Sequence, residues 1–268
     1  KHLVVKSRVL SALILAPIVL GIVYLGGLYF VCFAVLAMGI MTGEWRQLTN
    51  AGSIGSLGCF AVGIVITAII TTFVLAVPWA VTILFVGVIL VWLLARRQTA
   101  VSSVWIVSGV ISVGCSGIAL VWLRAEDLSG FLFVVWLMLA VWMTDICALF
   151  TGRFFGGPKL APSISPNKTW AGLVGGILGA ALWSGIWSYW TEIGSIFVLA
   201  IIGGGTAVLA QLGDLGVSVV KRRFGAKDTG NLIPGHGGLL DRMDGFLGAA
   251  PIVALSLAIA KGDISLWS

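Results

Sequence analysis

Two aspartates stand inside long apolar stretches of this 268-residue chain. Asp145 lies in residues 130–151 and Asp214 in residues 196–220, each about six residues before the end of its stretch. With a rise of about 1.5 Å per residue, both carboxylates are expected roughly 9 Å inside the helix end. An ionised carboxylate there usually faces a cavity, a partner or an ion. We therefore expect the two acids either to share a cation or to pair separately with basic side chains.

A charged segment, residues 221–244, follows the second stretch and combines three chemical features. It begins with a basic cluster, formed by Lys221, Arg222, Arg223 and Lys227. A glycine-rich turn comes next, in which the backbone N–H groups around Gly237 and Gly238 can converge on a phosphate. The segment ends with Asp241 and Asp244, whose spacing of three places both carboxylates on one helix face. The basic cluster alone is also typical of a helix end that touches lipid headgroups.

A second polar connection, residues 152–169, ends just before another apolar stretch. Pro166 predicts a turn, and the hydroxyl of Ser165 or Thr169 is suited to cap the helix that follows. Lys168 and these hydroxyls are then placed to contact a phosphate at a helix N-terminus. The alternative is a capped helix whose lysine only reaches out to the headgroups.

Asp145, Asp214, Asp241 and Asp244 give four carboxylates, and residues 221–244 add five basic side chains and a glycine turn. Carboxylate oxygens suit Mg²⁺, which proteins hold with one or two carboxylates plus substrate phosphates. Lysine and arginine bind the phosphates themselves. The chain lacks a GxxxxGK[ST] sequence, so a P-loop is excluded. The pattern predicts metal-assisted phosphoryl or nucleotidyl transfer, with His236 as a binding residue rather than a base.

The composition identifies the kind of protein that must position these residues. Only 10% of the residues are charged and 59% are apolar, whereas a soluble domain has about 25% charged residues. This excludes an ordinary soluble enzyme, a disordered chain and a collagenous chain. The apolar stretches are too long and too uniform for barrel strands of about ten alternating residues. We therefore expect an all-α integral membrane protein, a polytopic bundle.

Nine membrane-spanning helices are expected. They are residues 9–25, 27–43, 55–76, 79–95, 103–123, 130–151, 170–190, 196–220 and 244–261. The basic start, Lys1–Arg8, is interpreted as the flank of the first span rather than a signal peptide, because no clear cleavage site follows. Residues 1–130 contain only three acids and are expected to be a scaffold. Residues 131–268 are expected to be the catalytic region, with polar loops 152–169 and 221–243.

The basic residues predict the orientation. With nine spans and a cytoplasmic N-terminus, 14 of the 16 lysines and arginines fall on the cytoplasmic side. Only Arg124 and Lys261 fall outside. This asymmetry satisfies the positive-inside rule and predicts that loops 152–169 and 221–243 face the cytoplasm. The net charge of +6 is then explained by topology, and we expect no nucleic-acid partner.

Residues 218–244 resemble the signature of the phosphatidate cytidylyltransferases, also called CDP-diacylglycerol synthases. The matching positions are Ser218, Lys221, Arg222, Lys227, Asp228, Pro234, His236, Gly237, Gly238, Asp241, Arg242 and Asp244. Residues 165–169 and Asp145 are similar to further elements of the family. One departure is Ala171, which stands where the family usually has an acid before a glycine.

The resemblance implies that CTP and phosphatidate react to give CDP-diacylglycerol and pyrophosphate, with Mg²⁺ and with or without a second cation. It also implies a homodimer, which we expect in a bacterial inner membrane with the site facing the cytoplasm. The lipid phosphate is already anionic, so no protein nucleophile is needed and positioning dominates. Asp214 and Asp241 are expected to be the principal metal ligands. Asp145 and Asp244 are expected either to be further ligands or to contact the ligands without touching the metal. These four acids and Lys168 are expected to converge on one cavity.

The remaining candidate residues are expected to bind substrates. Phosphate contacts are assigned to Lys168, Lys221, Arg222, Lys227 and Arg242. Other substrate contacts are assigned to Ser165, Thr169, Ser218, Asp228, His236, Gly237 and Gly238. Two alternatives remain: a CTP-dependent kinase of the polyprenol kinase type, and a cation-coupled transporter. The long signature disfavours the kinase, and the clustering of acids near one face disfavours the transporter.

Overall fold

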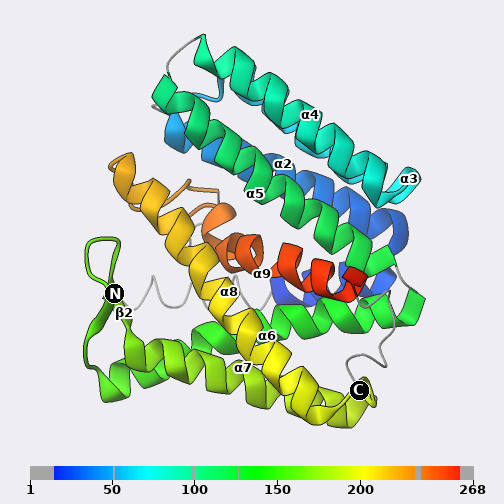
Figure 1. Ribbon diagram of the computed structural model, residues 1–268, viewed down its shortest axis with the longest axis vertical. Helices are drawn as coiled ribbons and strands as arrows, with labels where there is room; N and C mark the ends of the chain where they lie inside the picture. The colour runs from blue at the N-terminus through cyan, green and yellow to red at the C-terminus, as the bar shows by residue number, and fades with distance from the viewer. Residues whose placement is uncertain (1–14, 51, 98–99, 126, 233–236, 260–268) are drawn as a thin grey trace. The chain divides into compact units, whose positions relative to one another are not determined.

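The computed structural model describes residues 15–50, 52–97, 100–125, 127–232 and 237–259, and these form helices almost throughout. A first helix, Leu15–Leu25, is followed by eight longer ones. Their bounds are α2 Gly27–Thr49, α3 Gly55–Val74, α4 Val77–Arg96, α5 Ala100–Ala125, α6 Asp127–Phe155, α7 Trp170–Thr191, α8 Ile196–Arg223 and α9 Leu240–Ile259 (Figure 1). All eight are long and apolar enough to cross a membrane. The prediction of an all-α polytopic membrane protein is confirmed.

The helix boundaries have local causes. Gly26 and Gly27 both have positive φ, 62° and 48°, which ends the first helix before α2 because side-chain-bearing residues rarely adopt that conformation. Pro78 lies in the first turn of α4, the one helical position where its missing N–H costs nothing. Of the first expected span, residues 9–14 lie outside the described part of the chain.

The chain divides into two compact units, which are described separately. The first contains residues 1–131 and 220–243, and the second contains residues 132–219 and 244–268. The boundaries fall within α6, α8 and α9. The sequence-based division at residue 130 therefore lies close to one boundary, but loop 221–243 belongs to the unit of the N-terminal helices.

The first unit is a bundle in which α2, α3, α4 and α5 pack on one another. Its centre is apolar, with Met38, Val65 and Ile69 at most 1% exposed. At one end the indole N–H of Trp45 on α2 donates to the Trp105 carbonyl on α5 at 2.8 Å. Trp105 in turn meets Phe224 edge to face, with ring centroids 5.8 Å apart. This contact fixes the start of the loop that follows α8 to the N-terminal bundle.

The second unit is built from α6, α7 and the larger parts of α8 and α9. Trp136 on α6 is 1% exposed, and its indole N–H donates to the hydroxyl of Ser184 on α7 at 2.9 Å. Helices α8 and α9 approach so closely that a Cβ at Gly213 would lie 2.9 Å from the Gly248 nitrogen. A Cβ at Gly248 would overlap the Leu209 carbonyl oxygen. Backbone contact at this crossing requires glycine on both helices.

We expect Gly248→Ala to destabilise the protein by about 1–3 kcal/mol, because the added methyl has no room and backbone must shift. In detergent solution this should lower the apparent Tm by roughly 2–10 °C. Gly205→Ala, also on α8, is the matched control, since nothing lies within 4 Å of its Cβ position. Equal Tm values for the two variants would contradict the close approach of α8 and α9.

The connection after α6 is a β-hairpin, which the sequence analysis interpreted only as a polar turn. Strands β1 (Lys159–Ala161) and β2 (Ser165–Thr169) pair antiparallel. The strands were missed because they are short and mainly polar, and β2 contains Pro166, so no apolar alternation marks them. The hairpin ends at α7, where the Thr169 hydroxyl accepts a hydrogen bond from the Gly172 N–H at 3.0 Å. Of the two expected caps, Ser165 and Thr169, the structure uses Thr169.

Candidate functional site

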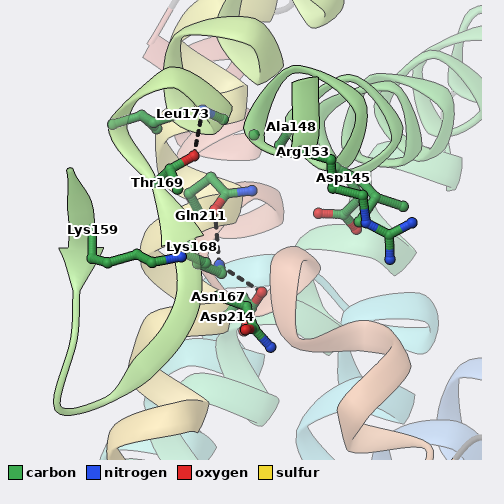
Figure 2. Close-up of a pocket in the computed structure, with 13 residues that line it drawn as sticks. Asp145, Ala148, Arg153, Lys159, Asn167, Lys168, Thr169, Leu173, Gln211 and Asp214 are labelled. Atoms are coloured by element: carbon green, nitrogen blue, oxygen red, sulfur yellow. Dashed lines mark hydrogen bonds and ion pairs between the residues drawn. The ribbon is translucent and has the colours of Figure 1, made fainter. Parts of the chain in front are cut away.

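The second unit contains a cavity of about 490 Å³, lined by α6, the hairpin, α7 and α8 (Figure 2). Five charged side chains line it: Asp145, Arg153, Lys159, Lys168 and Asp214. The two acids come from α6 and α8, and the three basic residues come from the end of α6 and from the hairpin. Three cationic groups beside two carboxylates suit a ligand with several phosphates and a divalent cation.

Lys168 is the central contact of this cavity. Its ammonium group lies 2.6 Å from Asp214 Oδ2 and donates to Gln211 Oε1 at 2.8 Å. Figure 2 shows the Lys168 side chain between these two residues of α8. The other carboxylate oxygen of Asp214 accepts a bond from the Ser218 hydroxyl at 3.3 Å. The hairpin thus positions Lys168 beside Asp214. The sequence left two alternatives for Asp214, a shared cation or a basic partner, and in the structure it has a basic partner.

Gln211 was missed by the sequence analysis, although a signal was present. It lies three residues before Asp214 on α8, so both side chains occupy the same helix face. Gln211 is 6% exposed, and a buried side-chain amide usually has a specific hydrogen-bond partner. Here that partner is Lys168, whose position the amide oxygen helps to fix.

The expected depth of Asp145 and Asp214 needs correction. Helix α6 continues to Phe155 and α8 to Arg223, so the two acids lie ten and nine residues before the helix ends. That corresponds to about 14–15 Å rather than roughly 9 Å. Helix α6 extends past its expected span through Gly152, Arg153 and two phenylalanines, and α8 extends through Lys221, Arg222 and Arg223. The expectation that both acids lie at similar distances from their helix ends is retained.

In the first unit Asp241 organises the charged segment, residues 221–244. Its Oδ1 accepts a bond from the Lys221 ammonium at 2.7 Å. Its Oδ2 accepts three: from the Thr229 N–H at 2.8 Å, the Thr229 hydroxyl at 3.0 Å and the Gly238 N–H at 3.1 Å. The side chain of Asp241 is 7% exposed and that of Lys221 is 12% exposed. One nearly buried carboxylate therefore connects the end of α8, the following loop and the start of α9.

The segment also contacts a residue of the scaffold region that the sequence analysis did not select. Glu44, near the end of α2, accepts bonds from the Leu239 and Leu240 N–H groups at 2.9 and 2.8 Å. A weak signal was available, because Glu44 is one of only three acids in residues 1–130 and directly follows the expected span 27–43. Its partners are almost 200 positions away in the sequence, and no local pattern indicates them.

The remaining candidates occupy varied places. Asp244 accepts a bond from the Gly245 N–H at 2.9 Å and is not among the residues lining the cavity. Gly237 has a φ of 84°, which favours glycine. His236 and Pro234 lie outside the described residues. The exposed candidates are Arg222, Lys227, Asp228 and Arg242, together with Asp145 of the cavity. Of the five residues expected to converge, Asp145, Lys168 and Asp214 line the cavity together, and Asp241 belongs to the first unit.

The carboxylates differ in their capacity for a metal. Within the described ranges, no group of three or more His, Cys, Asp or Glu residues is placed to hold an ion. A magnesium site commonly needs only one or two carboxylates, because substrate phosphates and water supply the other ligands. Asp145 and Asp214 fit that requirement, since both line a cavity with phosphate-binding side chains. Asp241 fits less well, because Oδ2 already accepts three hydrogen bonds and Oδ1 faces an ammonium group.

Comparison with known proteins decides the family. Residues 6–260 match the profile described as the cytidylyltransferase family. The chain belongs to this family. A protein of Brucella suis biovar 1 (strain 1330) named phosphatidate cytidylyltransferase is 36% identical over 272 residues, covering 97% of this chain and 96% of that protein. A protein of the same name from Staphylococcus haemolyticus (strain JCSC1435) is 31% identical over 259 residues, covering 94% and 98%.

The resemblance inferred from residues 218–244 is thereby confirmed. This cytidylyltransferase is a multi-pass membrane enzyme of the nucleotidyltransferase class. The family match includes the cavity, the charged segment and Glu44, because it runs from residue 6 to residue 260. The scaffold helices are thus part of the family fold and not an addition to it.

Proposed function

We propose that this cytidylyltransferase converts CTP and phosphatidate into CDP-diacylglycerol and pyrophosphate. The observation that carries the proposal is the complete signature from Ser218 to Asp244 in a chain that aligns almost end to end with proteins named for this activity. The cavity of the second unit supports it, because three basic side chains and two carboxylates suit a nucleoside triphosphate with a divalent cation.

The reaction needs positioning more than acid–base chemistry. An anionic oxygen of the lipid phosphate attacks the α-phosphorus of CTP, the bond from that phosphorus to the β-phosphate oxygen breaks, and pyrophosphate leaves. Lys168, Lys159 and Arg153 line the cavity, and their proposed role is to bind the phosphates and to offset the charge that develops on the leaving group. Lys221, Arg222, Lys227 and Arg242 of the charged segment are proposed as further phosphate contacts.

Mg²⁺ is the proposed cofactor, and Asp145 and Asp214 are the residues that would hold it. When bound, the ion would neutralise phosphate charge and make pyrophosphate a better leaving group. Asp214 would then exchange part of its contact with Lys168 for the cation, which leaves that ammonium group for the substrate. Asp241 remains a candidate metal ligand through Oδ1 alone. Asp244 remains a candidate either for a further ligand or for a residue that supports a ligand without touching the metal.

We also propose that the hairpin and the charged segment face the cytoplasm of a bacterial cell, and that the enzyme is a homodimer. The support for the orientation is the segregation of 14 of 16 basic residues to one side. A cysteine placed at Ser163, an exposed residue between the two strands, should be labelled by a membrane-impermeant reagent only after the cytoplasmic face is opened. Labelling in intact cells would contradict this orientation.

The activity test uses the purified protein in lipid nanodiscs with labelled CTP, phosphatidate and Mg²⁺. The expected products are pyrophosphate and a lipid that carries the CMP label, and EDTA should stop their formation. A CTP-dependent kinase would instead release CDP and transfer only the γ-phosphate. CDP without pyrophosphate would overturn the proposed reaction, and so would the absence of any CTP-dependent product.

A further inference from the structure

We infer that Glu44, a scaffold residue far from the signature in sequence, positions Asp241 and Lys221 for nucleotidyl transfer. This inference rests on the proposed function. It assigns Glu44 as a positioning residue, because the residue contacts the charged segment and not the cavity. Glu44 and the residues that it contacts all belong to the first unit.

The Glu44 carboxylate is buried and fully engaged by the charged segment. The residue is 6% exposed. Its Oε1 accepts a bond from the Leu239 N–H at 2.9 Å, and its Oε2 accepts bonds from the Leu240 N–H at 2.8 Å and the Thr229 hydroxyl at 3.3 Å. Burying an ionised carboxylate is costly unless such donors surround it. The three contacts explain why an acid is tolerated in an apolar helix.

Two of these donors lie at the start of α9. The first N–H groups of a helix have no partner within the helix, and the positive end of its dipole favours a negative charge. Glu44 supplies that charge from another helix, at the position where α9 begins. Asp241 is the next residue after Leu240. Holding Leu239 and Leu240 therefore fixes the backbone from which Asp241 projects.

The third donor connects Glu44 directly to Asp241. The Thr229 hydroxyl lies 3.3 Å from Glu44 Oε2 and 3.0 Å from Asp241 Oδ2, so the two carboxylates share its single proton, with the shorter contact to Asp241. Asp241 in turn holds the Lys221 ammonium at 2.7 Å. The contacts form a chain from Glu44 through Thr229 and Asp241 to Lys221. If the Glu44 side chain moves, Asp241 and Lys221 are therefore expected to move as well.

Glycine at position 238 is explained by the same contacts. A Cβ there would overlap the Thr229 hydroxyl and would lie 2.5 Å from Glu44 Oε2. At Gly230 a Cβ would lie 3.0 Å from Glu44 Oε1. The charged segment closes tightly around the carboxylate from both sides. Gly230 and Gly238 thus allow the contact with α2, a role separate from the phosphate binding expected of the glycine-rich turn.

The test compares Glu44→Gln with Thr49→Val in the full-length enzyme in nanodiscs. Glutamine preserves size, but one of its two terminal atoms is an NH₂ group that must face an N–H donor. Thr49 is a matched control, because it is buried in α2 and, among the described residues, its hydroxyl bonds only to carbonyls of the preceding turn. We expect kcat to fall between about tenfold and 100-fold in Glu44→Gln. Thr49→Val should stay within about twofold of the wild type, as expected for a site without shared partners.

Hydrogen exchange supplies a readout that does not depend on the reaction. Backbone amides of residues 237–243 should exchange faster in Glu44→Gln than in the wild type, with no such change in Thr49→Val. If the wild type makes no CDP-diacylglycerol, the proposed function fails, while faster exchange still supports the contact. Wild-type kcat and wild-type exchange in a folded Glu44→Gln protein would overturn the inference.

A second pair of variants decides the matter if Glu44→Gln does not fold. Thr229→Val removes only the bridging hydroxyl and nearly preserves the side-chain shape, whereas Thr229→Ser keeps the hydroxyl. We expect kcat to fall about tenfold in the valine variant and to recover in the serine variant, at similar Tm. Wild-type kcat in Thr229→Val would refute the proposed chain of contacts.

Discussion

Asp214→Asn should reduce turnover at least 100-fold while the protein remains folded in the membrane. The substitution removes one of two carboxylates in the cavity and the charge opposite Lys168 at 2.6 Å. Loss of on the order of 3 kcal/mol of transition-state stabilisation corresponds to this rate effect. The measurement is CDP-diacylglycerol formation by the purified variant at several Mg²⁺ concentrations. Higher Mg²⁺ should not restore the wild-type rate.

The control for this substitution is Glu192→Gln. Glu192 is an exposed acid at the end of α7, in the same unit but not among the residues lining the cavity. Its removal changes the net charge equally, so a general electrostatic effect would appear in both variants. We expect Glu192→Gln to retain the wild-type rate. An Asp214→Asn protein with normal rate and normal Mg²⁺ dependence would remove Asp214 from the site.

Asp241→Asn should also reduce turnover at least 100-fold, for a different structural reason. The amide can keep its oxygen toward Thr229 and Gly238 only by turning its NH₂ group toward the Lys221 ammonium. Removing one partner of a nearly buried ion pair is costly, typically by about 3–5 kcal/mol. We therefore expect Lys221 to leave its position, and the charged segment to lose its connection to α8.

A double-variant experiment separates this pairing from two independent roles. Lys221→Met alone should lower turnover by a factor similar to that of Asp241→Asn, because each leaves the other charge without its partner. If the two residues act as a unit, the double variant should be no slower than the slower single variant. If the rate losses of the two single variants instead multiply in the double variant, Lys221 and Asp241 do not act as a unit. The Tm of every variant must be measured, since loss of folding would imitate loss of activity.

The features that could be predicted from the sequence are those with a local physical cause. Apolar runs predicted the positions of the membrane-spanning helices. A cap at Ser165 or Thr169 was expected from their place before an apolar run, and the structure uses Thr169. The spacing of Asp145 and Asp214 indicated similar positions on two helices, and both line the cavity. Each of these inferences depends on residues within a few turns of each other.

The features that were missed depend on long-range contacts. The hairpin brings Lys168 to Gln211, 43 positions later in the chain, and its polar strands gave no alternating pattern. Glu44 contacts Thr229, Leu239 and Leu240 across 185, 195 and 196 positions. In the sequence Glu44 is only an acid at the end of an apolar stretch. Its role becomes visible only when the donors of the charged segment are placed around it.

The separation between Glu44 and its partners has a consequence for biosynthesis. At about 5–20 residues per second, Thr229 leaves the ribosome roughly 10–40 s after Glu44, because 185 positions separate them. During that interval α2 must enter the membrane while its carboxylate lacks all three of its final donors. Water at the membrane surface or a component of the insertion machinery has to solvate Glu44 until the chain has grown past Leu240. A nascent chain that stops before residue 229 therefore lacks the three donors that offset the cost of burying the Glu44 carboxylate.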